Sequence, residues 1–125
     1  MTCIRWPLRM PGRIGDHELQ LLYAASHLLV LPTLSLECFG IIVLDALAAG
    51  LPMIASRVGT IPEIIPFSLQ ACMFEPGDSR ELATLPKRFL ARELSVPPPH
   101  ELTAFVQVHY SPGRLRDDYV RLITS

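Results

Sequence analysis

Charged residues are scarce in this sequence. Only 18% of its 125 residues are charged, and 11 Lys and Arg against 12 Asp and Glu leave a formal net charge of −1. A chain this close to neutral lacks the basic surface that holds nucleic acid or an anionic membrane. Its 50% hydrophobic content is also far from the composition of disordered chains. We therefore expect a folded domain with no nucleic-acid partner.

Cysteines are few as well, and their positions exclude two architectures. The three are odd in number and no two form a Cys-x-x-Cys pair, while the four histidines are scattered without ligand spacing. A disulfide framework needs an even set and a zinc site needs closely spaced ligands, so neither is expected. We interpret Cys3, Cys38 and Cys72 as buried or incidental thiols in a reducing compartment.

The sequence also has no apolar run long enough to cross a membrane. Its longest is interrupted by Asp45, Gly50 and Pro52, whereas a spanning helix needs about 20 predominantly apolar residues in a row. Arg5 and Pro7 stand where a secretory signal peptide would be continuously hydrophobic. We expect a cytoplasmic protein, with a peripheral position at the inner membrane face as the alternative.

Helix and strand signals alternate along the chain. Asp16 is a good N-cap for a first helix, and Asp78 with Glu81 forms a capping pair for a later helix that Pro86 should kink. A short unbroken apolar run indicates a strand buried on both faces. The expected strands lie at 28–31, 52–55 and 71–74, and the expected helices at 16–26, 39–49, 62–65 and 78–89, with two more beyond residue 100.

This order predicts an α/β fold, a partial Rossmann-like three-layer sandwich with a short parallel sheet, right-handed crossovers and a helical C-terminus. The length allows one compact domain and no second. We divide the chain into a poorly defined N-terminal remnant at 1–15, a Rossmann-like core at 16–95 and C-terminal helices at 96–125. Because no convincing strand precedes Asp16, we expect the chain to begin partway through a larger doubly wound domain.

The residues that point to function follow the first expected strand. Glu37 precedes Phe39, Gly40 and Ile41, which open a helix, and Asp45 is the only charge in that helix. Free amides and the positive dipole end of a helix start form an anion site, and we expect the Asp45 carboxylate to be buried. Two carboxylates around an anion site suit a ligand with a phosphate in its middle and hydroxyls at both ends, such as a sugar nucleotide.

The segment from Glu37 to Asp45 resembles the Glu-x7-Glu motif, in its Glu-x-Phe-Gly form, of the retaining GT-B glycosyltransferases called glycosyl transferases group 1. The likeness continues in order through residues 18–26 and 30–33 upstream and 46–56, 59–63 and 74–78 downstream. It implies the C-terminal, donor-binding domain of a hexosyltransferase-type enzyme. Such an enzyme moves a sugar from a UDP- or GDP-linked donor to an acceptor, in polysaccharide or glycolipid synthesis.

The resemblance also assigns roles to individual residues. Glu37, the catalytic residue, would contact the transferred sugar, the amides of the helix start would bind sugar hydroxyls or diphosphate, and Asp45 would hold the ribose hydroxyls. The family is generally metal-independent, so the resemblance implies neither a metal nor another cofactor. The residues assigned to the sugar nucleotide are Glu37, Phe39, Gly40, Ile41, Asp45, Gly59 and Thr60.

Three departures from the family pattern leave alternatives open. The acceptor domain and the front of the donor domain, with its Arg and Lys, are not matched, Asp45 replaces the second Glu, and Cys38 replaces a frequent Gly. We therefore expect turnover to need an acceptor domain or partner chain, and an incomplete sheet to self-associate. An inactive remnant acting as an interaction module is the alternative. An unrelated nucleotide-binding module is a third, without a Gly-x-Gly-x-x-Gly or phosphate-loop sequence to support it.

Several of the site residues also have a purely structural interpretation. Glu37 in a loop is often a solvated carboxylate, and Gly40 could serve close packing of a helix on a strand. Asp45 could cap a loop or pair with Arg57. Residue types alone favour these interpretations, whereas the eight-residue spacing of Glu37 and Asp45 favours the sugar nucleotide.

Overall fold

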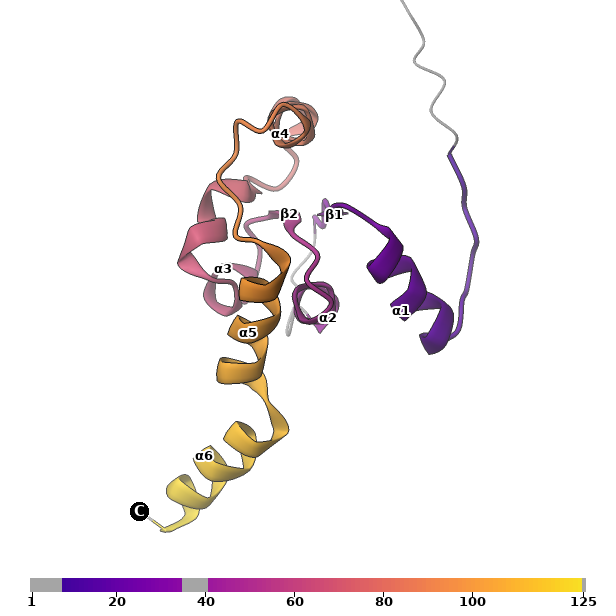
Figure 1. Ribbon diagram of the computed structural model, residues 1–125. Coiled ribbons are helices and arrows are strands. Elements are labelled where there is room, and N and C mark those ends of the chain that lie inside the picture. The colour runs from indigo at the N-terminus through magenta and orange to yellow at the C-terminus, as the bar shows by residue number, and fades with distance from the viewer. Residues whose placement is uncertain (1–7, 35–40, 125) are drawn as a thin grey trace, which may run out of the picture.

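A computed structural model describes residues 8–34 and 41–124 (Figure 1). Within these ranges, helices and strands alternate in the first two thirds of the chain and three long helices follow. The elements are α1 (Asp16–Ala25), β1 (Leu29–Leu31), α2 (Ile41–Ala48), β2 (Met53–Ser56), α3 (Ile61–Ile64), a 3-10 helix η1 (Phe67–Cys72), β3 (Met73–Phe74), α4 (Ser79–Leu90), α5 (Pro99–Tyr110) and α6 (Pro112–Thr124).

The three strands form a parallel sheet in the order β1-β2-β3. Leu29 pairs with Met53, and Ala55 pairs with Met73. Helix α4 covers one face of the sheet, and α2 and α3 lie on the other (Figure 1). The α/β class, the Rossmann-like short parallel sheet and the helical C-terminus predicted from the sequence are confirmed.

The core is built around β2, the middle strand, all four residues of which are buried. A central strand of a parallel sheet is covered on both faces, which explains its unbroken apolar sequence. The same expectation was wrong for β1, where Val30 is 39% exposed. Among the described residues β1 pairs with β2 alone, so its other edge has no neighbouring strand.

The end of α2 and the start of α5 pack closely together. Gly50 follows α2 with a φ of +79°, the left-handed conformation expected for a glycine at a helix end. A Cβ added to Gly50 would lie 2.9 Å from Cβ of Pro99, so this position also has no room for a side chain. Thr103 donates from Oγ1 to the Ala48 carbonyl at 3.2 Å. Residues about fifty positions apart therefore hold one layer together.

Some of the local predictions from the sequence are confirmed and others were wrong. The Asp78 cap is confirmed, because the Glu81 amide donates to its Oδ1 at 3.1 Å. Helix α4 continues through Pro86. Asp16 was expected as the N-cap of α1, but Gly15 holds that position and Asp16 is the first helical residue. In this helix Tyr23 is buried, whereas Leu22 is 50% exposed. The 3-10 helix η1 was not predicted.

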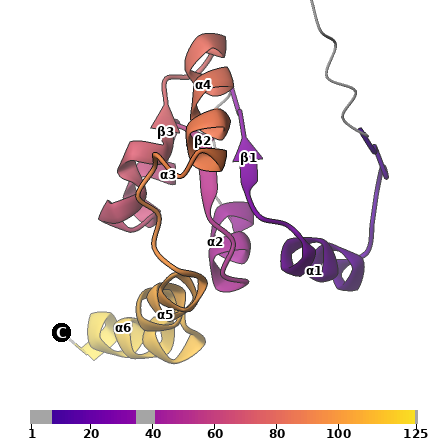
Figure 2. The same ribbon diagram turned by 45° about the horizontal axis from the view of Figure 1, so that its top comes forward.

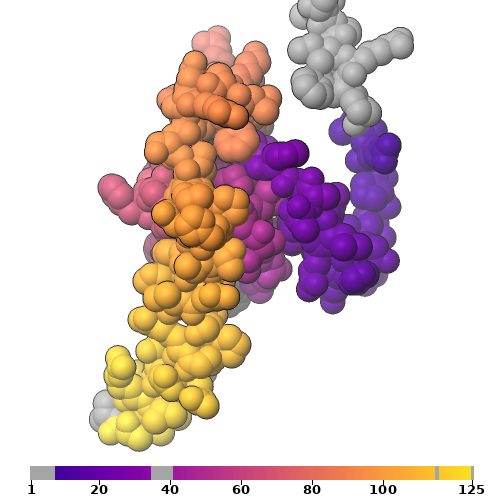
Figure 3. Space-filling view, in the orientation of Figure 1, coloured from indigo at the N-terminus to yellow at the C-terminus, as the bar shows by residue number. Residues whose placement is uncertain are grey.

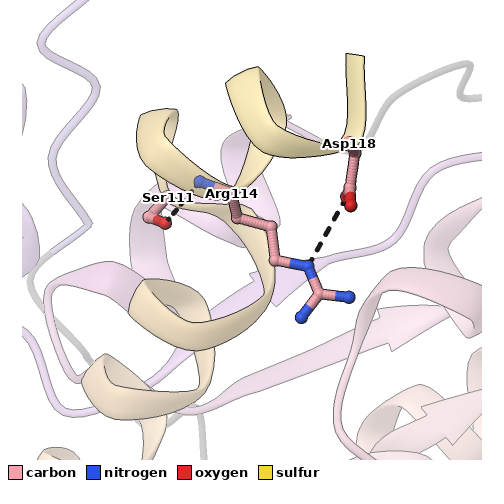
Figure 4. Close-up of polar contacts among 3 residues, drawn as sticks. All are labelled: Ser111, Arg114 and Asp118. Carbon is pink, nitrogen blue, oxygen red and sulfur yellow. Dashed lines mark hydrogen bonds and ion pairs between the residues drawn. The ribbon is translucent and has the colours of Figure 1, made fainter. Parts of the chain in front are cut away.

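The last helix extends away from the rest of the molecule (Figures 1 and 3). The Arg114 amide donates to Oγ of Ser111 at 3.2 Å, which caps the start of α6. Arg114 Nε lies 3.5 Å from Asp118 Oδ2 (Figure 4). Arg116 pairs with Asp117 in the same way at 3.6 Å. This charged surface is a solvated mixed face, not a basic patch.

Candidate functional site

The residues assigned to a sugar nucleotide divide into three groups. Glu37, Phe39 and Gly40 lie outside the described residues. Ile41 and Asp45 belong to α2, as its first residue and one turn further on. The segment between β2 and α3 contains the other two, Gly59, with a φ of +58°, and Thr60.

The carboxyl ends of β1 and β2 are tied by a buried serine. Ser56, the last residue of β2, donates from Oγ to the Thr33 carbonyl at 2.6 Å. A cavity of about 220 Å³ opens at this end of the sheet, lined by Leu34 and Phe74 and by Asp78 at the start of α4. Ligands of open α/β sheets bind beyond the carboxyl ends of the strands. The segment that contains Glu37 follows Leu34 directly in the sequence.

Asp45 is exposed, so the expectation of a buried carboxylate in α2 was wrong. The helix is less buried than its apolar sequence indicated, because Ile41 is 61% and Ile42 38% exposed. Asp45 lies in the wall of a cavity of about 440 Å³ between α1 and α2, here called the α1–α2 cavity. The residues that line it are Asp16, Leu19, Gln20, Tyr23, Asp45, Ala48 and Ala49.

Tyr23 adds an unusual polar group to the α1–α2 cavity. Its side chain is only 7% exposed, and its hydroxyl is buried without a hydrogen-bond partner among the described residues. Burial first, and the negative charge of Asp45 second, raise the pKa of Tyr23. The hydroxyl therefore stays protonated at neutral pH and can donate. A buried polar group without a partner costs free energy, which a ligand acceptor could offset.

Arg57 does not neutralise Asp45. Its Nε lies 3.5 Å from Oε1 of Glu75, and the two side chains are 44% and 71% exposed. Asp45 has no hydrogen bond or ion pair from its side chain within residues 8–34 and 41–124. The structural interpretation of Asp45 as a partner of Arg57 was therefore wrong, and its carboxylate is available to a ligand.

The α1–α2 cavity combines acceptors and donors. Asp16 and Asp45 accept hydrogen bonds, the Tyr23 hydroxyl donates, and the Gln20 amide does both. This set matches a ligand with several hydroxyl groups. Sequence reasoning missed the contribution of α1, although Asp16, Gln20 and Tyr23 recur at i, i+4 and i+7 and so share one helical face. Neither Gly59 nor Thr60 is among the described residues that line the α1–α2 cavity. The structure therefore brings Asp45 together with residues of α1 and not with Gly59 and Thr60.

Fold and sequence together identify the family. A parallel sheet with helices on both faces places the chain in the Rossmann-like α/β class (Figure 1). Residues 5–92, well over half of the chain, match the family described as Glycosyl transferases group 1, and the chain belongs to this family.

Three curated relatives share this region. A sulfoquinovosyl transferase of Arabidopsis thaliana is 37% identical over 81 residues, which are 62% of this chain and 16% of the relative. The O-antigen chain mannosyltransferase B of Escherichia coli is 36% identical over 58 residues, 46% of this chain and 15% of the relative. An alpha-(1->4)-mannosyltransferase of Mycolicibacterium hassiacum is 35% identical over 78 residues, 62% of this chain and 19% of the relative. The chain thus matches less than a fifth of each relative's length.

The helices give one further observation on membranes. Within residues 8–34 and 41–124, none combines the length and the apolar character that a membrane-crossing helix requires.

Proposed function

We propose that this chain forms the donor-binding region of a retaining glycosyltransferase and binds a nucleoside-diphosphate sugar, UDP- or GDP-linked. The glycosyl group would pass to an acceptor held by another domain, in a longer protein or in a partner chain. In this proposal Glu37 contacts the transferred sugar, and the amides of Phe39, Gly40 and Ile41 bind sugar hydroxyls or diphosphate. No metal takes part.

The observation that carries the proposal is the polar pair in the α1–α2 cavity. The Asp45 carboxylate accepts hydrogen bonds from vicinal hydroxyls such as those of ribose, and the Tyr23 hydroxyl donates one to a ribose oxygen. The side chain of Asp45 is one methylene shorter than that of Glu. The Asp45 carboxylate is exposed and does not pair with Arg57, so it can reach a ligand directly or through water. Gly59 and Thr60 would line the base or ribose pocket from the neighbouring loop.

The proposed chemistry is electrostatic. Departure of the sugar leaves negative charge on the diphosphate, and amides at the start of α2 would stabilise that charge as it develops. The positive end of the α2 dipole points the same way, because α2 begins at Ile41, directly after the Glu37 segment. Basic side chains that complete the neutralisation would come from the acceptor domain or from a preceding part of the donor domain.

A second candidate function is an interaction module without turnover. Helix α6 favours it, since Tyr119 is 62%, Val120 54% and Ile123 74% exposed. An apolar surface of this kind suits a protein partner or a second copy of the chain. Sedimentation of the purified chain tests the self-association, and a monodisperse monomer at all concentrations would contradict it.

The proposal is tested by calorimetric titration of the chain with UDP, with GDP, and with one UDP-linked and one GDP-linked sugar. Saturable binding of one nucleotide is expected, and Glu37→Ala should weaken the sugar nucleotide more than the free nucleotide, because Glu37 contacts the sugar. Asp45→Ala should weaken both by about tenfold or more, the value of one or two hydrogen bonds to a charged group.

Asp117→Ala is the matched control for the titration, because Asp117 is an exposed carboxylate of α6, remote from the cavity in sequence. It should leave every affinity unchanged. If the folded wild-type chain binds none of the ligands, the donor site is vestigial and the interaction module is the better function.

A further inference from the structure

A second large cavity lies at the opposite end of the sheet from Ser56. Its volume is about 490 Å³. Ser26 and His27 precede β1, and residues 50–52 precede β2, so the cavity lies where the parallel strands begin. Its other wall is the end of α4 and the segment that leads from α4 to α5 (Figure 2). We call it the amino-end cavity.

The wall of the amino-end cavity is mainly apolar. Leu51 and Leu94 are buried in it, Phe89 and Val96 are half-buried, and Leu90 is 71% exposed. Small-molecule sites have volumes of about 300–1,000 Å³ and mostly apolar walls with a few polar groups. Size and wall both suit a small apolar ligand.

The polar residues of this cavity are Ser26, His27 and Arg92, and no carboxylate lines it among the described lining residues. The Ser26 hydroxyl donates to the Leu22 carbonyl, and Arg92 carries the positive charge. Neither His27 nor Arg92 takes part in an ion pair within residues 8–34 and 41–124. The carboxylate nearest in sequence, Glu93, is 3.8 Å from Arg88 instead. An anionic group at the cavity would therefore meet a guanidinium that has no ion-pair partner in the described part of the chain.

The backbone of Arg92 is strained. Its φ is +59°, the single positive value found for a described residue other than glycine. It follows the last turn of α4, where the amides of Arg92 and Glu93 donate to the carbonyls of Phe89 and Arg88. Helices commonly end this way with a glycine, because a Cβ is unfavourable in the left-handed conformation. An arginine at this position favours a role for its side chain.

We propose that the amino-end cavity binds an anionic amphiphile: a soluble molecule with one apolar chain and a carboxylate or phosphate head. The head lies at Arg92, whose planar guanidinium can form paired hydrogen bonds with either group, and His27 adds a donor. The apolar chain of the ligand packs on Leu51, Phe89 and Leu94. This site is separate from the α1–α2 cavity, and the proposal for it does not depend on the proposed donor site.

The test is a calorimetric titration of the full chain with decanoate, and with decyl phosphate in a second arm, below micelle-forming concentrations. Decylamine, with the same chain and the opposite charge, is the ligand control. Decanoate or decyl phosphate should bind saturably, and decylamine at least about tenfold more weakly. Binding of decylamine as tight as that of decanoate would overturn the proposal, as would no saturable binding of either anion.

Arg92→Gly separates binding from folding. Glycine suits the left-handed backbone, so the melting temperature should rise, while loss of the guanidinium should weaken anion binding about tenfold. A purely structural Arg92 would not produce opposite changes. Arg92→Gln, which keeps the apolar stem, should weaken binding similarly, and Arg80→Gln, outside the cavity, should not. Unchanged anion affinity in both Arg92 variants would overturn the proposal. UDP and GDP titrations of Arg92→Gly should match the wild type.

Discussion

The centre of the molecule and its two outlying helices, α1 and α6, are built very differently. Strand β2 is buried throughout, and α2 and α5 pack against each other beside it. Helix α1 has one buried residue, Tyr23, and α6 has none among its described side chains. The centre can therefore specify its own structure, whereas α1 and α6 present surfaces that a ligand or a partner would complete.

The chemistry of the two regions differs accordingly. The polar side chain buried in the centre, Ser56, has its hydrogen bond within the protein. In α1, the Tyr23 hydroxyl is buried without one among the described residues, and Tyr23 lines the same cavity as Asp45. The unsatisfied polar group of α1 and the exposed apolar side chains of α6 thus lie outside the centre, where a binding function is expected.

The largest effect on this comparison should come from truncating a core residue. Leu102 of α5 is 1% exposed. Leu102→Ala removes a buried side chain and leaves a cavity, and should lower the free energy of unfolding by about 2–5 kcal/mol in urea titrations. Ile123→Ala in α6 is the control, because Ile123 is 74% exposed. It should change stability by no more than about 0.5 kcal/mol. Equal losses in the two variants would break the distinction.

A smaller effect is expected from adding one methyl group in each region. Gly50→Ala places a Cβ 2.9 Å from Pro99 on a backbone with a φ of +79°. The strain should cost about 1–3 kcal/mol. Gly113 in α6 has no atom within 4 Å of an added Cβ. Gly113→Ala should be neutral or stabilising by up to about 1 kcal/mol. Thermal melts of both variants measure the contrast, which a loss in Gly113→Ala would contradict.

The smallest effect concerns the ionisation of Tyr23. Burial and the charge of Asp45 raise its pKa, so its contribution to stability is complete below the ordinary tyrosine value of about 10 and is lost as pH rises through the folded-state pKa. Asp45→Asn removes the charge and should lower this pKa in ultraviolet titrations, with Tyr23→Phe identifying the transition. Tyr110, whose pKa is raised by burial alone, should be unaffected. An unchanged Tyr23 pKa in Asp45→Asn would show that the Asp45 charge does not act on the Tyr23 hydroxyl.

The sequence predicted the centre well because its signals are local and mutually consistent. An unbroken apolar run marked β2, and Gly50 and Asp78 marked helix ends by their backbone and capping preferences. The strand expected at 71–74 was right only in its second half, because η1 extends to Cys72 and β3 is Met73–Phe74. Exposure at the edges could not be predicted in this way. Val30 and Ile41 look like core residues in sequence, but their exposure depends on which neighbours lie beside β1 and α2. That is a property of the assembled fold.

The candidate site was predicted only in part for the same reason. Asp45 was found by its spacing from Glu37, but its partner Tyr23 is 22 positions earlier in the chain and resembles an ordinary core aromatic. Their proximity arises when α1 and α2 enclose a common cavity. Likewise, no pattern marked Arg92, since a positive φ at a residue other than glycine has no sequence signature.

The central claim is that Tyr23 and Asp45 together hold hydroxyls of a sugar nucleotide. It is tested most directly by the affinities of the wild type, Tyr23→Phe, Asp45→Asn and the double variant for the UDP- or GDP-linked sugar that binds. We expect each single change to weaken binding, and the double variant to lose less than the sum of the two in free energy, because both side chains contact one ligand group. Wild-type affinity in Asp45→Asn and Tyr23→Phe would contradict the claim.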